Sequence, residues 1–356
     1  MSAGTKIEWT DQTWNVVTGC DRVSPGCDHC YALTMAKRLK GMGSAKYQRD
    51  GDPKTSGPGF GVSTHEDALY LPTTWRKPKR VFVDSMSDLF HAEVPADFIA
   101  RVFATMAMTR QHTYQILTKR HARMRSLLGS PEFADQVRDA LMDLGAFCDR
   151  QEPFWPLPNV WLGVSVENQA WADIRIPALL DTPAAVRFLS CEPLLGPVDL
   201  SSWVPGRSDP DSCTCRSWRV LGVKAHVGGC PALIYRAIDW VITGGESGAG
   251  ARPMHPDWVR TLRDQCVAGG VPFLFKQWGA WAPWAPEDWS EDAGGANCVM
   301  RDGSTGWVAG NEDYLTNWSR IDGTQHIVSR VGKKRAGRVL DGRTWDEFPA
   351  IPLEPP

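Results

Sequence analysis

The sequence has no run of about 18 apolar residues, which is the length that a membrane-spanning helix needs. Its first residues, MSAGTKIEWTDQTW, also lack the apolar core of a secretory signal. We therefore expect a cytoplasmic protein. Because the cytosol keeps thiols reduced, its ten cysteines predict metal ligands rather than disulfides where they cluster.

A strong charge of one sign is missing as well. The net charge is -2, so there is no global attraction to nucleic acid or to anionic lipid, and any basic surface must be local. Internal repeats and low-complexity tracts are also absent. At 356 residues the chain exceeds one small domain, and a catalytic α/β body of about 250 residues with extensions is the simplest expectation.

What the chain does contain is a series of short, continuous apolar or β-branched runs, typical of parallel strands that are buried on both faces. They cover residues 14–18, 81–83, 114–117, 160–164, 186–189, 240–243 and 272–275. Amphipathic helices are predicted from about residue 30 and over about 98–106, 131–144 and 258–266. The alternation predicts a partial (β/α) barrel of six or seven parallel strands.

Three regions interrupt this alternation. Residues 41–75 are glycine-rich and polar, which predicts a long loop or lid. Residues 201–236 form a cysteine-bearing insertion, and residues beyond about 277 lose helical periodicity. We therefore predict a barrel over residues 1–277 and a turn-rich appendage over 278–356.

The densest chemical signal is C-x6-C-x2-C, formed by Cys20, Cys27 and Cys30 directly after the first predicted strand. Three thiolates are one short of the usual set for a 4Fe-4S cluster, so one iron would keep an open position for a substrate or cofactor. The alternative is a structural zinc site with His29 or another cysteine as fourth ligand.

Several motifs resemble the phage-associated three-Cys-motif family, whose members are regarded as radical-SAM-like. They are WNVVTGC at 14–20, CDHCYA at 27–32, SCEPLLGP at 190–197, TGGESG at 243–248 and FKQWG at 275–279. The resemblance implies a 4Fe-4S cluster that chelates S-adenosylmethionine (SAM), reductive cleavage to a 5'-deoxyadenosyl radical and hydrogen abstraction. It also implies a three-Cys-motif partner protein.

Polar residues follow nearly every predicted strand, where a barrel places its chemistry. As SAM-binding candidates we take Ser85, Ser87, Asp88, Lys119, Arg120, Ser165, Glu167, Asn168 and Glu246. Some of them are equally suited to capping helices. Gly244-Gly245-Glu246 permits close backbone approach to a ligand, with Arg252 nearby, or else forms a tight turn.

The insertion offers a second set of soft ligands, Cys213, Cys215, His226 and Cys230, which suits a small structural zinc site. The alternative is unrelated thiols in a loop. Tryptophans 278, 281, 284 and 289 either stack on a ligand or pack the appendage, and we favour packing.

These features favour a radical SAM enzyme acting on a macromolecule, for which local basic clusters make nucleic acid one candidate. Two rivals stay open: a non-catalytic, metal-stabilised nucleic-acid-binding protein, and a module that only organises a complex with its partner. Polar groups that converge from many strand ends favour the enzyme.

Overall fold

The computed structural model describes residues 5, 7–146, 155–204, 217–220, 223–226, 237–283, 295–309 and 325–350. In this part of the chain no helix is long and apolar enough to cross a membrane.

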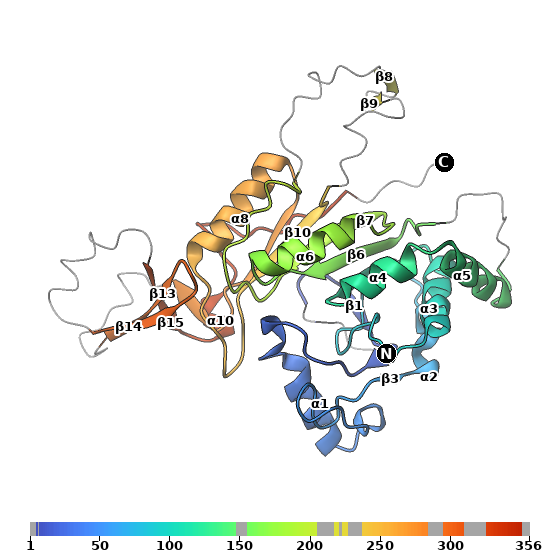
Figure 1. Cartoon of the computed structure of the whole chain (residues 1–356), viewed down its shortest axis with the longest axis horizontal. Helices are drawn as coiled ribbons and strands as arrows, with labels where there is room; N and C mark the ends of the chain where they lie inside the picture. The colour runs from blue at the N-terminus through green and yellow to red at the C-terminus, as the bar shows by residue number, and fades with distance from the viewer. Residues whose placement is uncertain are drawn as a thin grey trace. The chain divides into compact units, whose positions relative to one another are not determined.

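The main sheet is a curled, parallel, seven-stranded sheet in the order β1-β4-β5-β6-β7-β10-β11 (Figure 1). Its strands are β1 Gln12–Trp14, β4 Arg80–Val83, β5 Thr113–Thr118, β6 Val160–Ser165, β7 Val186–Cys191, β10 Trp240–Gly244 and β11 Phe273–Gln277. The predicted partial (β/α) barrel is confirmed. Every residue of β6 and of β10 is buried, as expected of strands covered on both faces.

The first predicted strand, 14–18, is wrong as a single element. Only β1 joins the large sheet, whereas β2 Val17–Thr18 pairs antiparallel with β3 Ser63–Thr64. The chain leaves the sheet because the backbone N–H of Val17 donates to the side chain of Asp84 at 2.9 Å instead of to a neighbouring strand.

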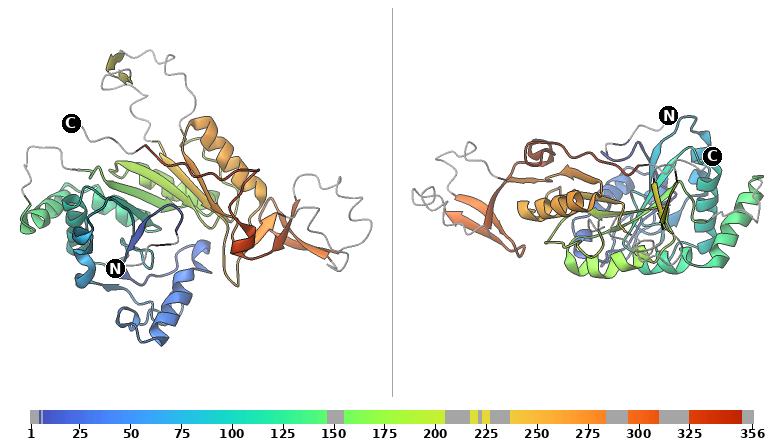
Figure 2. Two further views of the ribbon diagram at one scale, coloured as in Figure 1. Left: turned by 180° about the vertical axis from the view of Figure 1, so that it is seen from behind. Right: turned by 90° about the horizontal axis from the view of Figure 1, so that it is seen from above.

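Contacts divide the chain into two compact units. The first comprises residues 1–192, 248–251 and 351–356. Its helices are α1 Tyr31–Gly41, α2 Glu66–Leu69, α3 Ala96–Met108, α4 His121–Leu128, α5 Pro131–Asp143 and α6 Gln169–Leu180, with short 3-10 turns η1 Pro25–Cys27, η2 Ala45–Tyr47 and η3 Leu71–Thr74. Helices α3 to α6 lie on the outside of strands β4 to β7, as the views in Figures 1 and 2 show.

The predicted helices in this unit are confirmed, and their starts have clear local causes. Ser130 accepts the N–H of Phe133 at 3.2 Å and precedes a proline at the first position of α5. The predicted loop over 41–75 contains α2, β3 and two of the 3-10 turns, but no long regular element.

The second unit comprises residues 193–247 and 252–350. It holds β10, β11 and the predicted helix α8 Pro256–Gly269. Beyond residue 277 the chain forms an antiparallel sheet in the order β12-β15-β13-β14, which the sequence pattern did not predict. Its elements are β12 Trp281–Pro283, β13 Gly295–Met300, β14 Thr305–Ala309, β15 Gln325–Arg330 and the short helix α10 Lys333–Ala336; the insertion contributes a hairpin of β8 Ser217–Val220 and β9 Val223–His226. The boundary at residue 277 stays a prediction.

Candidate metal centre

Cys20 lies beside the loop that follows β4. The preceding residue, Gly19, forms a parallel bridge with Ser87 and donates its N–H to the carbonyl of Met86 at 3.1 Å. Gly19 has a φ of +89°, and an added Cβ would lie 2.3 Å from the carbonyl oxygen of Gly61. Only glycine therefore allows the chain to pass here and deliver Cys20 to the strand ends.

Cys27 and Cys30 follow on a compact turn. Cys27 ends the 3-10 turn η1, and its carbonyl accepts the N–H of Cys30 at 3.3 Å. Cys30 is the N-cap of α1, where the helix dipole favours a thiolate. Both Cys20 and Cys30 pack against one apolar cluster that includes Ala32 and Phe60.

Two of the three thiols, those of Cys20 and Cys30, have raised pKa values. Burial raises the pKa of Cys20 to about 12, with Asp88 adding to the rise and Arg120, whose Nη2 lies 4.0 Å from the sulfur, opposing it. Burial also raises the pKa of Cys30. In such a site a bound cation, rather than a proton, best balances the thiolates.

This donor set fits a cluster better than a single zinc ion. Zinc holds its thiolates about 2.3 Å from one metal, so their sulfurs crowd together. Among the described residues, the groups whose ligand atoms all lie within 4.8 Å of one another do not include Cys20, Cys27 and Cys30. A cluster spreads its thiolates over separate irons and needs no such crowding.

Several predicted SAM-binding residues have protein partners in the structure. Asp88 accepts the hydroxyl of Thr118 at 2.7 Å and the backbone N–H of Lys119 at 2.9 Å, so it ties the β4 loop to the end of β5. Ser87 donates to the carbonyl of Val17 at 2.8 Å. Ser85 donates to the side chain of Asn15 at 3.1 Å. Their role toward SAM stays a prediction.

A second group of predicted residues is brought together at the ends of β5 and β6. Lys119 Nζ lies 3.0 Å from the hydroxyl of Ser165 and 3.5 Å from a carboxylate oxygen of Glu167. A fourth member, Arg175, was not predicted from the sequence; its Nη1 donates to Glu167 at 2.8 Å. Arg175 stands among the buried apolar positions of α6, so a charged residue at a core position was the available signal.

Asn168 and Glu246 have local structural roles. Asn168 is the N-cap of α6 and accepts the N–H of Trp171 at 3.3 Å. In the second unit Glu246 accepts the backbone N–H, Nε and Nη2 of Arg252 at 2.7–2.9 Å. Gly245 packs against the backbone of Trp278 so closely that an added Cβ would lie 1.9 Å from its carbonyl oxygen.

The predicted zinc ligands Cys213, Cys215 and Cys230, and the side chain of His226, lie outside the described residues. Tryptophans 284 and 289 also lie outside them. Trp278 is buried, packs against Phe275 and donates to the carbonyl of Val339 at 2.9 Å, in agreement with a packing role.

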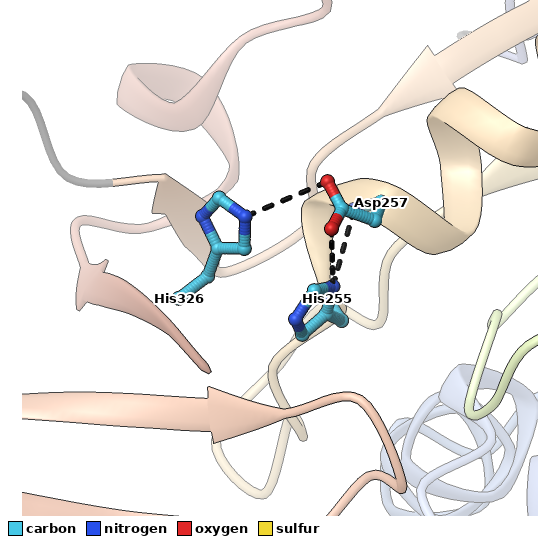
Figure 3. Close-up of side chains that lie close together, drawn as sticks. All are labelled: His255, Asp257 and His326. Carbon is cyan, nitrogen blue, oxygen red and sulfur yellow. Dashed lines mark hydrogen bonds and ion pairs between the residues drawn. The ribbon is translucent and has the colours of Figure 1, made fainter. Parts of the chain in front are cut away.

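A separate polar cluster joins α8 to β15 in the second unit (Figure 3). Asp257 lies 3.5 Å from His326 Nε2 and 4.0 Å from His255 Nδ1, so the three ligand atoms are close enough for a metal. However, Arg260 and Arg301 also lie 3.3 and 3.4 Å from the Asp257 carboxylate. Two guanidinium groups already balance its charge and would repel a cation, which favours an ion-pair network that fastens the helix to the sheet.

The fold and the cysteine loop define a partial β/α-barrel protein with three thiols at the strand ends. The chain belongs to the family described as "Protein of unknown function (DUF5131)", whose profile matches residues 4–349. No curated protein matches it. The resemblance to the phage-associated family stays a prediction.

Two solved structures of spore photoproduct lyase are similar to this chain. A cysteine-to-serine mutant has a TM-score of 0.33 and 11% identity, and the match covers 89% of this chain and 74% of that one. The enzyme complexed with dinucleoside spore photoproduct has a TM-score of 0.30 and 10% identity, covering 86% of this chain and 71% of that one.

Proposed function

We propose that this protein is an iron–sulfur enzyme of the radical SAM type, in which Cys20, Cys27 and Cys30 hold a 4Fe-4S cluster. The observation that carries the proposal is that one loop brings its thiols to the strand ends: Gly19, before Cys20, bridges to Ser87 after β4, and Ser24, beside Cys27, contacts Glu167 after β6. A barrel of parallel strands concentrates its chemistry at that end. When bound, such a cluster would supply an open iron position for SAM and one electron for its cleavage.

The chain's own residues would orient the ligands and restrict water. The apolar cluster behind Cys20 and Cys30 shields that side of the site. Arg120 places a positive charge 4.0 Å from the sulfur of Cys20 and also donates to the carbonyl of Asp21 at 3.0 Å. Lys119 adds a second positive charge at the strand ends, where its Nζ lies 3.5 Å from Glu167 and 3.0 Å from the hydroxyl of Ser165.

The substrate we propose is a macromolecule, with nucleic acid as the candidate class, and a three-Cys-motif protein is the proposed companion. Both rest on the sequence motifs and local basic clusters rather than on the geometry of the site. The proposal of SAM chemistry is independent of them.

The test is formation of 5'-deoxyadenosine by anaerobically reconstituted protein supplied with SAM and a strong one-electron reductant. We expect slow product formation without the natural substrate, because the thiols and the open iron suffice for SAM cleavage. Replacing Cys20, Cys27 or Cys30 by alanine should abolish it. The matched control is Cys266→Ala, because Cys266 is a buried thiol on α8 in the second unit.

If cluster-loaded protein forms no more 5'-deoxyadenosine than its cysteine variants, the proposed radical SAM activity is excluded. The metal-stabilised binding protein would then be the better account.

A further inference from the structure

The loop that carries Cys27 is attached to a buried carboxylate from another strand end. Ser24 donates its hydroxyl to Glu167 Oε1 at 2.6 Å, and the same hydroxyl lies 3.9 Å from the sulfur of Cys27. Ser24 and Glu167 are both buried. A single side chain therefore links the carboxylate to the metal-ligating loop.

Glu167 also contacts this loop through its shape. A Cβ added at Gly26 would lie 2.5 Å from Glu167 Oε1 and 2.6 Å from its Cγ. Contacts this short would force the carboxylate or the loop to move. The Ser24-Pro25-Gly26 segment is thus fitted against Glu167 by a hydrogen bond at one residue and by the absence of a side chain at another.

Two cations surround the carboxylate. Arg175 Nη1 donates to Glu167 Oε2 at 2.8 Å, and Lys119 Nζ lies 3.5 Å from Oε1. Burial pushes the pKa of Glu167 upward, but Lys119, Arg175 and the hydrogen bond from Ser24 outweigh it and hold the pKa below its ordinary value. The carboxylate is therefore charged at neutral pH.

Burying charged side chains costs free energy, which pairing them offsets only in part. The side chains of Arg175 and Glu167 are both fully buried. Arg175 also donates to the carbonyl of Ser165 at 2.8 Å and lies 4.0 Å from the ring of Trp171, yet its Nε and Nη2 have no hydrogen-bond partner within the described part of the chain. A buried ion pair of this kind is weak evidence for stability alone and is better explained by a local role.

We propose that Glu167 is a positioning residue for Cys27, holding the Ser24–Gly26 segment at the metal centre while Lys119 and Arg175 balance its charge. The inference rests on the proposed metal centre but makes its own claim about the loop. Groups that hold a ligand from outside the coordination sphere orient it and tune the metal. The carboxylate should therefore affect both loop mobility and the reduction potential of a bound cluster.

The experiment combines hydrogen exchange with a redox titration on Glu167→Gln, Ser24→Ala and the control Ser130→Ala. The control removes a hydroxyl that caps α5 and has no contact with Glu167 in the structure. We expect residues 24–30 to exchange several-fold faster in Ser24→Ala than in the parent protein or the control. Glu167→Gln keeps the side-chain size but removes a negative charge, so the cluster potential should shift to a more positive value.

The two readouts separate the possible failures. Unchanged exchange of residues 24–30 in Ser24→Ala would overturn the positioning role whether or not iron is bound. An unshifted potential in loaded Glu167→Gln would overturn the electrostatic part. If the parent protein takes up no iron, the proposed function fails, while hydrogen exchange of the metal-free protein still decides the role of Ser24 and Glu167. Should Glu167→Gln not fold, Ser24→Ala alone decides the positioning claim.

Discussion

Asp84 is the residue at which conformation and electrostatics are most unusual. It is buried, and its φ of 60° is left-handed although it is not a glycine. Burial raises the pKa of Asp84 to about 8, with Asp88 adding to the rise and the backbone N–H groups of Val17 and Val16 opposing it. Its Oδ2 has no hydrogen-bond partner among the described residues. Strain and a perturbed carboxyl together at a barrel strand end are typical of functional sites.

The raised pKa predicts a pH-dependent stability. Because the folded value of about 8 lies above the unfolded value of 3.8, the folded state retains a proton that the unfolded state releases. The contribution of Asp84 to the free energy of unfolding is therefore fully present below pH 3.8. It is lost as pH rises toward 8, by up to about 1.4 kcal/mol per pH unit.

Asp84→Asn should remove this loss, since asparagine tolerates the left-handed conformation and keeps an acceptor for Val17. Urea unfolding over a series of pH values should show the variant gaining on the parent protein as pH rises from about 4 to about 8. Parallel pH profiles for the two proteins would show that Asp84 is not a buried acid with a raised pKa.

Helix α6 joins the C-terminal end of β6 to the buried charge cluster around Glu167. It begins at its cap Asn168, directly after Glu167, and carries Arg175 on its buried face. Helix α6 packs on β6, so the position of its first turn governs the position of Glu167. Asn168 has two competing roles, a helix cap in the structure and a SAM contact expected from the sequence.

The variant Asn168→Ala distinguishes the role of helix cap from that of SAM contact. Loss of the cap should lower the free energy of unfolding by about 1 kcal/mol, as measured by urea denaturation, and leave the affinity of the loaded protein for SAM unchanged. Asn168→Ser is the matched control, because serine also caps helices and should restore stability. A variant of unchanged stability that binds SAM weakly would show instead that Asn168 contacts the cofactor.

The elements that could be predicted are those whose signal is local. The strands at 160–164 and 240–243 consist of apolar or β-branched residues, as suits strands that are buried on both faces, and α5 begins at Pro131 directly after its cap Ser130. The break between β1 and β2 could not be predicted, since it depends on the side chain of Asp84, far away in sequence. The same is true of the attachment of Ser24 to Glu167.

At the scale of the whole molecule, the proposed chemistry belongs to one compact unit. Cys20, Cys27, Cys30 and the buried cluster around Glu167 all lie within residues 1–192, together with strands β1 and β4 to β7. The cysteine motif could be located from spacing alone, whereas its immediate surroundings depend on residues from three different strand ends. The C-terminal antiparallel sheet escaped prediction because glycines interrupt β13 and β14 and polar residues interrupt β15, so none of these strands is a continuous apolar run.

The proposed function requires above all that the three thiols hold a cluster with an open iron position. The most direct measurement is the EPR spectrum of the reconstituted, reduced protein before and after addition of SAM. We expect a reduced 4Fe-4S signal that changes on SAM addition and is missing from the Cys20→Ala, Cys27→Ala and Cys30→Ala variants. Stoichiometric zinc with no cluster signal after anaerobic reconstitution, or a cluster signal that SAM leaves unchanged, would contradict it.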